Sequence, residues 1–259
     1  LAEAIASHRR AIALQPALPD AHLALAEALL RDGQWREGWR EYEWRWHSKA
    51  AHRRAFTQPR WDRGSPAGGT VLLHAEQGLG DTLQFCRYVP MVARHARVVL
   101  EAPAPLLRLL CGLEGVAELV ATGDRLPAFD RHCPLLSLPL AFGTKLSGIP
   151  AEMPYLQPVA SDAARWRARL AALPGRRVGL CWAGNPALAD IRANPIDRRR
   201  SLPAGVLAPL AGLPGISFVS LQKGAAPPPG LALHDWTAEL HDFAETAALV
   251  AGLDLVISV

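Results

Sequence analysis

Short runs of aliphatic residues alternate with stretches of helical periodicity from residue 70 to the end of the sequence. A short apolar run bounded by turn residues predicts a strand buried on both faces, and the periodic stretches between such runs predict helices. The predicted strands cover residues 70–76, 97–101, 116–121, 177–182, 216–221 and 255–259, with a further strand or loop over 129–138. The predicted helices cover residues 81–94, 105–113, 161–173, 206–213 and 243–251. This alternation predicts the α/β class, with parallel sheets covered by helices on both faces.

The pattern restarts after residue 175, which predicts two Rossmann-like units rather than one. We expect residues 70–160 to form the first unit. Residues 161–259 are expected to form a linking helix, capped by Ser161 or Asp162, and the second unit. The second unit is expected to be truncated, because only three strands are predicted in it and a mean sheet has about 5–6.

Residues 1–50 carry a repeating all-α pattern. Ala4 and Gly38 lie 34 positions apart, and Gly33 separates two predicted helices. A period of this length with paired helices resembles tetratricopeptide repeats, of which about one and a half would be present. We expect Asp20 to cap the second helix and the segment to act as a cap or adapter that could bind a protein partner. A generic helical hairpin is the alternative.

Residues 51–69 are basic and contain several proline and glycine residues, which predicts a linker between the helices and the first α/β unit. Tryptophans lie before and within it, at Trp44, Trp46 and Trp61. Because a large aromatic side chain at a junction buries much apolar area, we expect these tryptophans to pack the helices onto the next unit.

The composition is that of a globular protein, with 50% hydrophobic and 20% charged residues among 259. This excludes a disordered or fibrous chain. The net charge is +4, and the densest basic run, at 198–200, has no aromatic residues interleaved with it, so no nucleic-acid partner is predicted. No apolar run approaches the ~20 residues of a membrane helix, and no transmembrane segment is predicted.

The cysteines and histidines give no sign of a disulfide framework or a metal site. The four cysteines form no C-x-x-C pair, which together with the absence of a leader segment predicts reduced thiols in a cytoplasmic protein. The nine histidines show no H-x-x-x-H pairing, so no metal and no metal cofactor are expected. Neither G-x-S-x-G nor G-x-x-x-x-G-K-[ST] occurs, which argues against esterases with a nucleophile elbow and against P-loop nucleotidases.

The loop after the first predicted strand contains Gly78, Gly80 and Asp81. Two glycines before a helix, with Glu101 about 20 residues further on, suggest a dinucleotide fingerprint. However, Leu83 replaces the third glycine, and the Asp81 carboxylate would repel a pyrophosphate. Asp81 is therefore interpreted as a general base at the mouth of a cleft, with a helix N-cap as the alternative.

Polar residues also follow the strands of the second unit. Asn185 lies in the loop after the strand 177–182, and Arg199, Arg200 and Ser201 precede the next predicted helix. Paired guanidinium donors and a hydroxyl group beside a helix start suit a diphosphate, although a solvated basic loop is the alternative. After the following strand, Gln222 and Lys223 could bind a nucleobase, a ribose or a phosphate, or could form an ordinary strand exit.

Two histidines complete the candidates. His132 lies at a strand-end loop, where it could contact a substrate or serve a structural role. His74 lies within the first predicted strand and is expected to be a core histidine whose hydrogen bonds are satisfied.

Five segments together resemble a known enzyme family. They read GLGDTLQFCRYVP (78–90), FDRHCPLLSLP (129–139), VGLCWAGNP (178–186), RRRSLP (198–203) and SLQKG (220–224). With the leading helices, they are similar to bacterial tetratricopeptide-repeat proteins that carry a glycosyltransferase-like region of the heptosyltransferase family, and more distantly to O-GlcNAc transferases. The resemblance implies a GT-B fold, a pair of Rossmann-type domains with the acceptor on the first and the nucleotide-sugar on the second.

The resemblance also assigns roles to individual residues. It implies that Asp81 is the catalytic base, that Arg200 binds the donor phosphates, and that Asn185 lies near the donor. It places the remaining candidates on the donor side (Arg199, Ser201, Gln222, Lys223) or on the acceptor side (Gly78, Gly80, Gln84, His132). In the family an Asp-Thr/Ser pair and a histidine-containing helix follow the last strand. The sequence ends at Val259, before them, so we expect an incomplete donor site.

We therefore expect an inverting glycosyltransferase fragment that transfers a sugar from a nucleotide-diphosphate sugar to a hydroxyl of a glycan or protein acceptor, with no cofactor beyond this donor. In this interpretation arginines balance the charge of the departing diphosphate. The alternative is a repeat-bearing scaffold or binding protein whose transferase-like domain is not catalytic. A dinucleotide oxidoreductase is the third candidate.

Overall fold

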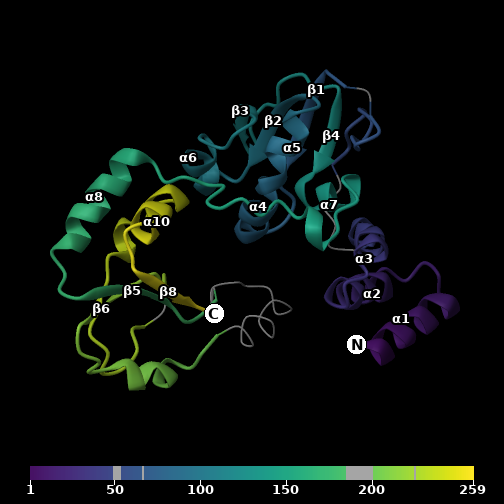
Figure 1. Cartoon of the computed structure of the whole chain (residues 1–259). Helices are drawn as coiled ribbons and strands as arrows, with labels where there is room; N and C mark the ends of the chain where they lie inside the picture. The colour runs from purple at the N-terminus through teal and green to yellow at the C-terminus, as the bar shows by residue number, and fades with distance from the viewer. Residues whose placement is uncertain (49–53, 66, 185–200, 225) are drawn as a thin grey trace. The chain divides into compact units, whose positions relative to one another are not determined.

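The chain forms two compact units, Leu1–Tyr155 and Leu156–Val259, each of which is described by itself. The structure is a computed structural model and describes residues 1–48, 54–65, 67–184, 201–224 and 226–259 (Figure 1). The first unit contains the helical segment and one sheet. The second unit contains the other sheet.

Each sheet has four parallel strands. The first sheet consists of β1 (Thr70–His74), β2 (Arg97–Ala102), β3 (Val116–Ala121) and β4 (Arg131–Pro134), in the order β3-β2-β1-β4 (Figure 1). The second consists of β5 (Arg176–Cys181), β6 (Ile216–Ser220), β7 (Leu233–His234) and β8 (Leu255–Ser258), in the order β7-β6-β5-β8. Within each unit this is the order 3-2-1-4, which is that of the first four strands of a Rossmann-type sheet. The predicted α/β class with two Rossmann-type sheets is confirmed.

The second sheet has one strand more than the sequence predicts. β7, Leu233–His234, pairs with β6 through only two residues. A strand this short leaves no alternation of apolar and polar positions, so the hydrophobic pattern could not reveal it. The expectation of three strands in the second unit is therefore wrong.

Helices of several lengths connect the strands. In the first unit they are α4 (Leu79–Phe85), η2 (Cys86–Tyr88), α5 (Val89–Ala93), η3 (Ala104–Leu106), α6 (Leu107–Leu110), η4 (Leu135–Ser137), α7 (Leu138–Ala141) and η5 (Leu146–Gly148), where η marks a 3₁₀ helix. In the second unit they are α8 (Ala160–Ala171), η6 (Ala204–Leu210), η7 (Thr237–Glu239) and α10 (Phe243–Val250).

Proline interrupts two of the predicted helices. The single helix expected over 81–94 is broken into α4, η2 and α5, because Pro90 has no N–H group to continue the α-helical hydrogen bonds. The helix expected over 206–213 is a 3₁₀ helix with Pro209 inside it.

The predicted helix caps lie elsewhere. α2 (Pro19–Arg31) begins with Pro19 after the N-cap Leu18, and Asp20 lies inside the first turn. Proline favours the first helical position because its missing N–H has no partner there in any case. α8 is preceded by the N-cap Val159, so Ser161 and Asp162 also lie inside the first turn. Asp20 and Asp162 can still interact favourably with the helix dipole from these positions.

Helices cover both faces of the second sheet. On β6, Val219 packs with Trp166 of α8 and Leu249 of α10, whereas its neighbour Phe218 packs with Leu207 of η6. Successive side chains of a strand point to opposite faces, so these two clusters lie on opposite sides of the sheet. For the second sheet, this arrangement confirms the prediction that helices cover both faces.

The helical segment consists of α1 (Ala2–Leu14), α2, α3 (Trp35–Tyr42) and η1 (Glu43–His47). Ile5 of α1 packs against Leu25 and Leu29 of α2. A Cβ atom at Gly38 would lie 2.8 Å from the Leu30 side chain, which explains why this helix contact needs a small residue. Paired helices are present as predicted, and their assignment to tetratricopeptide repeats stays a prediction.

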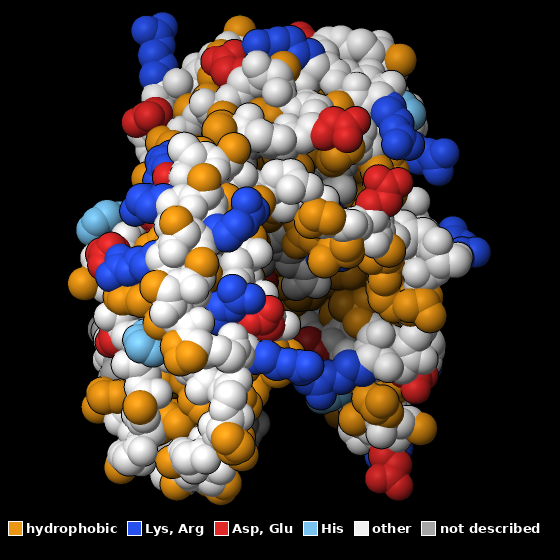
Figure 2. All heavy atoms as spheres, turned by 60° about the vertical axis from the view of Figure 1, so that its left-hand side comes forward, with side chains coloured by type: hydrophobic (Ala, Val, Ile, Leu, Met, Phe, Trp, Pro, Cys, Tyr) orange, Lys and Arg blue, Asp and Glu red, His pale blue; other side chains and the backbone are white. Residues whose placement is uncertain are grey.

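Charged side chains of both signs are interspersed among apolar and neutral ones on the face shown in Figure 2. Within the described parts of the chain, none of the helices combines the length and apolar character that a membrane span requires. The cysteines are free, with Cys86 and Cys133 buried and Cys111 exposed.

Candidate functional site

The strand order of the first sheet reverses between β1 and β4. In open α/β sheets, ligands bind beyond the carboxyl ends of the strands at such a switch point. The register pairs His74 with Pro134 and Leu72 with His132 across these two strands. The Nε2 atom of His74 lies 3.3 Å from the Nδ1 atom of His132, so the two imidazoles share a hydrogen bond at this edge.

A cleft lies at this edge of the sheet. Two cavities, of about 340 and 400 Å³, share three lining residues. Together they form one cleft, called the switch-point cleft. The shared residues are Trp46, Arg54 and His74. His132, a predicted acceptor-side residue, lines the smaller cavity together with Phe56 and Arg60. The cleft therefore combines aromatic walls with two guanidinium groups and three imidazoles, those of His47, His74 and His132, which suits a polar ligand that also has an apolar or ring surface.

The imidazoles of His74 and His132 are held in the neutral form. Burial, followed by the charges of His132 and Arg54, lowers the pKa of His74 to about 3. Burial also lowers the pKa of His132, and Arg60 and Arg54 lower it further. At neutral pH each ring therefore offers one donor and one acceptor nitrogen. The prediction that His74 is a satisfied core histidine is wrong for Nδ1, which is buried without a hydrogen bond among the described residues.

Glu101 lies at the end of β2 with only 1% of its side chain exposed. One carboxylate oxygen pairs with Arg54, and the other has no hydrogen-bond partner among the residues described. This is the residue that a dinucleotide fingerprint would use to bind a ribose. Here the carboxylate is covered and ion-paired, and a dinucleotide would have to displace Arg54 to reach it.

Asp81 lies in the first turn of α4. Its carboxylate accepts a hydrogen bond of 3.0 Å from the backbone N–H of Gly78, the residue that precedes the helix. Asp81 is thus the third helical residue and not the N-cap that the alternative interpretation expects. Asp81 is partly exposed, and Gly80 and Gln84 beside it are exposed. Gln77, directly before Gly78, lines the cleft, so the loop that carries Asp81 begins at its rim.

In the second unit, Ser201 and Gln222 hold the loop after β5 from two sides. The Ser201 hydroxyl accepts a 3.1 Å hydrogen bond from Gly184 N–H. The side-chain oxygen of Gln222 accepts hydrogen bonds from the N–H groups of Trp182 and Ala183, at 3.1 and 2.8 Å. The amide of Gln222 thus orders the loop, and direct contact with a nucleoside stays a prediction.

Of the other donor-side candidates, the structure describes only Lys223. Lys223 donates a hydrogen bond of 2.5 Å to the backbone oxygen of Leu240, which fixes its ammonium group near the end of β6. Asn185, Arg199 and Arg200 lie outside the described residues.

Sequence reasoning missed a buried ion network beside the cleft. Arg45 of η1 donates hydrogen bonds to Glu43 of the same helix, to Glu76, which follows β1, and to Ser137 of η4. The Ser137 hydroxyl in turn donates to Glu43. Arg45 and Glu76 are 31 positions apart, and neither stands in a motif. The nearest signal is the pair of tryptophans that flank Arg45, since an arginine between two large apolar side chains often buries its stem.

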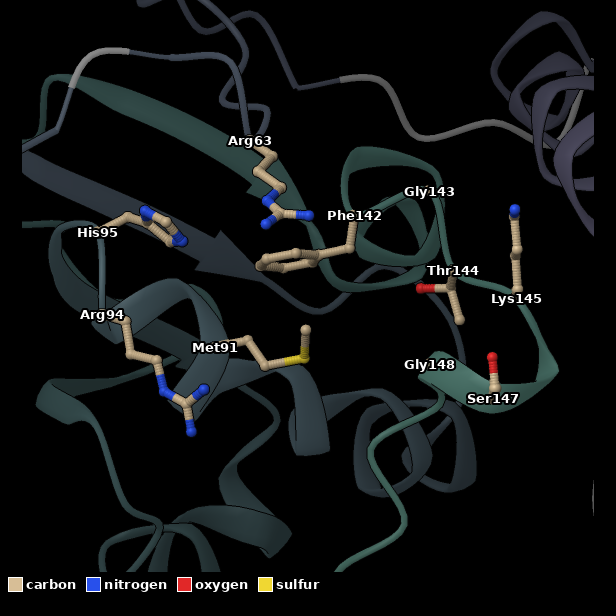
Figure 3. Close-up of a pocket in the computed structure, with 10 residues that line it drawn as sticks. All are labelled: Arg63, Met91, Arg94, His95, Phe142, Gly143, Thr144, Lys145, Ser147 and Gly148. Atoms are coloured by element: carbon tan, nitrogen blue, oxygen red, sulfur yellow. The ribbon is translucent and has the colours of Figure 1, made fainter.

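A second pocket lies at the opposite edge of the first sheet, near the start of β2 (Figure 3). It measures about 320 Å³, and its ionisable lining residues are all of the basic type: Arg63, Arg94, His95 and Lys145. Figure 3 shows Arg63 pointing toward the ring of Phe142, whereas Lys145 points away from it. None of the residues predicted from the sequence lines this pocket. Across the part of the chain that the structure covers, no group of three or more His, Cys, Asp or Glu side chains could hold a metal ion.

Comparisons with known proteins give two similarities. No family model matches the chain. The chain is 28% identical over 269 residues to Protein FlbA of Caulobacter vibrioides, covering 90% of this chain and 44% of that protein, so it spans less than half the length of this relative. The crystal structure of the glycosyl transferase family 9 protein from Veillonella parvula is similar at a TM-score of 0.48 and 10% identity, over 73% of this chain and 75% of that chain. The α/β fold class rests on the strand orders given above.

Proposed function

We propose that the protein is a glycosyltransferase of the GT-B type, with the acceptor bound by the first unit and a nucleotide-diphosphate sugar by the second. One observation carries the proposal. Two Rossmann-type sheets of the same strand order each have a glycine-containing polar loop directly after their first strand. Gly78 in the first loop begins the GLGD segment, and Gly184 in the second belongs to the WAGN segment, and the family resemblance depends on these two segments.

The proposed reaction is a displacement with inversion at the anomeric carbon. The acceptor hydroxyl attacks that carbon, and its proton passes to the Asp81 carboxylate. The bond from the carbon to the diphosphate oxygen breaks, and the nucleoside diphosphate leaves with the electron pair. Arg199, Arg200 and Lys223 would balance its charge. The switch-point cleft would bind the acceptor through His132 and the aromatic walls.

The Asp81→Asn variant tests the role of Asp81 as the base. Asparagine can still accept the hydrogen bond from Gly78 N–H, so the helix start is preserved while the basic carboxylate is lost. We expect the release of nucleoside diphosphate from a panel of ADP-, GDP- and UDP-linked sugars to fall by about 10²-fold or more.

The matched control is Asp20→Asn, at an exposed position on α2, which should leave the rate unchanged. An Asp81→Asn variant with the wild-type rate would rule out Asp81 as the base. No release from any donor would favour the non-catalytic scaffold.

A further inference from the structure

Arg45 is buried between the helical segment and the first sheet, with 7% of its side chain exposed. Its Nε and Nη2 atoms donate to the two oxygens of Glu76, at 3.1 and 2.9 Å, which makes the pair bidentate. Nη2 also donates to the Ser137 hydroxyl at 2.6 Å, and Nη1 donates to Glu43 at 2.8 Å. A planar guanidinium with this many partners is fixed in both position and orientation.

Glu76 connects the fixed Arg45 guanidinium to the loop after β1, because Glu76 is itself a residue of that loop. The residue lies two positions beyond the last residue of β1, His74, and two before Gly78. One of its oxygens also accepts a hydrogen bond from Leu136 N–H, so Glu76 is held from the β4 side as well. Burial raises the pKa of Glu76 although Arg45 opposes the rise. Without Arg45, a buried carboxylate would lose its countercharge, and the loop would have to rearrange to hydrate it.

The helical segment also contacts the chain on either side of Asp81. Before it, the Gln77 side chain donates a 3.1 Å hydrogen bond to the Tyr42 hydroxyl. After it, Phe85 packs edge-on against Trp39, with ring centroids 5.9 Å apart. Burial raises the pKa of Tyr42, and the hydrogen bond with Gln77 opposes the rise.

We propose that Arg45 is a positioning residue: through Glu76 it holds the loop after β1 together with the first turn of α4 (residues 75–81, called the 75–81 loop), and with it Asp81, against the helical segment. The inference rests on the proposed function for the role of Asp81, but the order of the loop can be measured without any activity. The helical segment is then a part of the transferase site. It does not act only as an adapter for other proteins.

The first test is amide hydrogen exchange of the intact protein. In Arg45→Met, we expect peptides that cover residues 75–81 to exchange at least tenfold faster, while peptides from β2 and β3 keep their wild-type rates. Arg9→Met is the matched control, because the Arg9–Glu37 pair lies on the same helical segment with its side chains 50% and 39% exposed. This control should leave the 75–81 loop unchanged.

The second test separates positioning from folding. Arg45→Lys keeps the charge but not the bidentate geometry, and it should give intermediate exchange and a kcat reduced about threefold to tenfold, with the KM for the sugar donor within twofold of wild type. If Arg45→Met does not fold, Arg45→Lys serves as the test. Wild-type exchange of the 75–81 loop in both variants would overturn the proposal. So would faster exchange spread evenly over the whole first unit. A protein without transferase activity would contradict the proposed function and leave the exchange test intact.

Discussion

At the scale of single residues, His74 makes stability depend on pH. Its pKa is about 3 in the folded protein, against about 6.5 for an unperturbed histidine. Between these values the unfolded chain binds a proton that the folded chain does not, so stability is full above about pH 6.5 and falls as the pH is lowered. The loss should reach about 2 kcal/mol at pH 5, at about 1.4 kcal/mol per pH unit. His132, whose pKa is also lowered, adds to it.

Urea unfolding at pH 7.5, 6.5, 5.5 and 5.0 measures this effect. Asparagine at position 74 cannot titrate, so His74→Asn should flatten the dependence of the unfolding free energy on pH, whatever its effect on absolute stability. A wild-type protein equally stable at pH 5 and pH 7 would contradict the burial of a neutral imidazole at the switch point.

At the scale of elements, the turn between α8 and β5 depends on Gly175. This residue has a φ of +68°, and an added Cβ atom would lie 2.1 Å from the backbone oxygen of Gly215. That oxygen cannot move away freely, because it accepts the hydrogen bond from Arg176 N–H at the start of β5. Gly212 has a similar φ of +80° but open space around it.

The two glycines form a matched pair for a stability measurement. Gly212→Ala should cost about 1–2 kcal/mol from backbone strain alone. Gly175→Ala should cost about 1–3 kcal/mol more, because its methyl group also displaces the Gly215 backbone. Equal losses in the unfolding free energy of the two variants would contradict the close approach of the α8–β5 turn to the loop before β6.

The elements themselves could be predicted where the local pattern decides them. β1 and β6 are short, largely apolar runs buried on both faces, and this pattern identifies them as strands. The break at Pro90 could also have been foreseen, since the missing N–H is a local property. The Arg45–Glu76 pair could not, because burial of a charged side chain depends on a partner 31 residues away and leaves no trace in local periodicity.

At the scale of the whole molecule, the two units repeat one topology but differ in how their candidate sites are built. The first unit has a cleft at the switch point, and His74 and His132 are among the residues that line it. In the second, Gln222 and Ser201 order the loop after β5, and Arg200 lies outside the described residues. The presence of two Rossmann-like units could be inferred from the restart of the pattern, whereas the hydrogen bonds of Gln222 to the backbone of the β5 loop could not.

The central claim is that the second unit binds a nucleoside diphosphate as part of a sugar donor. Calorimetric titration of ADP, GDP, UDP and NAD into the natural full-length protein tests it most directly. We predict that one nucleoside diphosphate binds with a Kd on the order of micromolar, that Arg200→Ala weakens it at least tenfold, and that NAD does not bind. If none of the three nucleoside diphosphates binds, the claim is contradicted and a binding scaffold is favoured. Binding of NAD alone would favour an oxidoreductase.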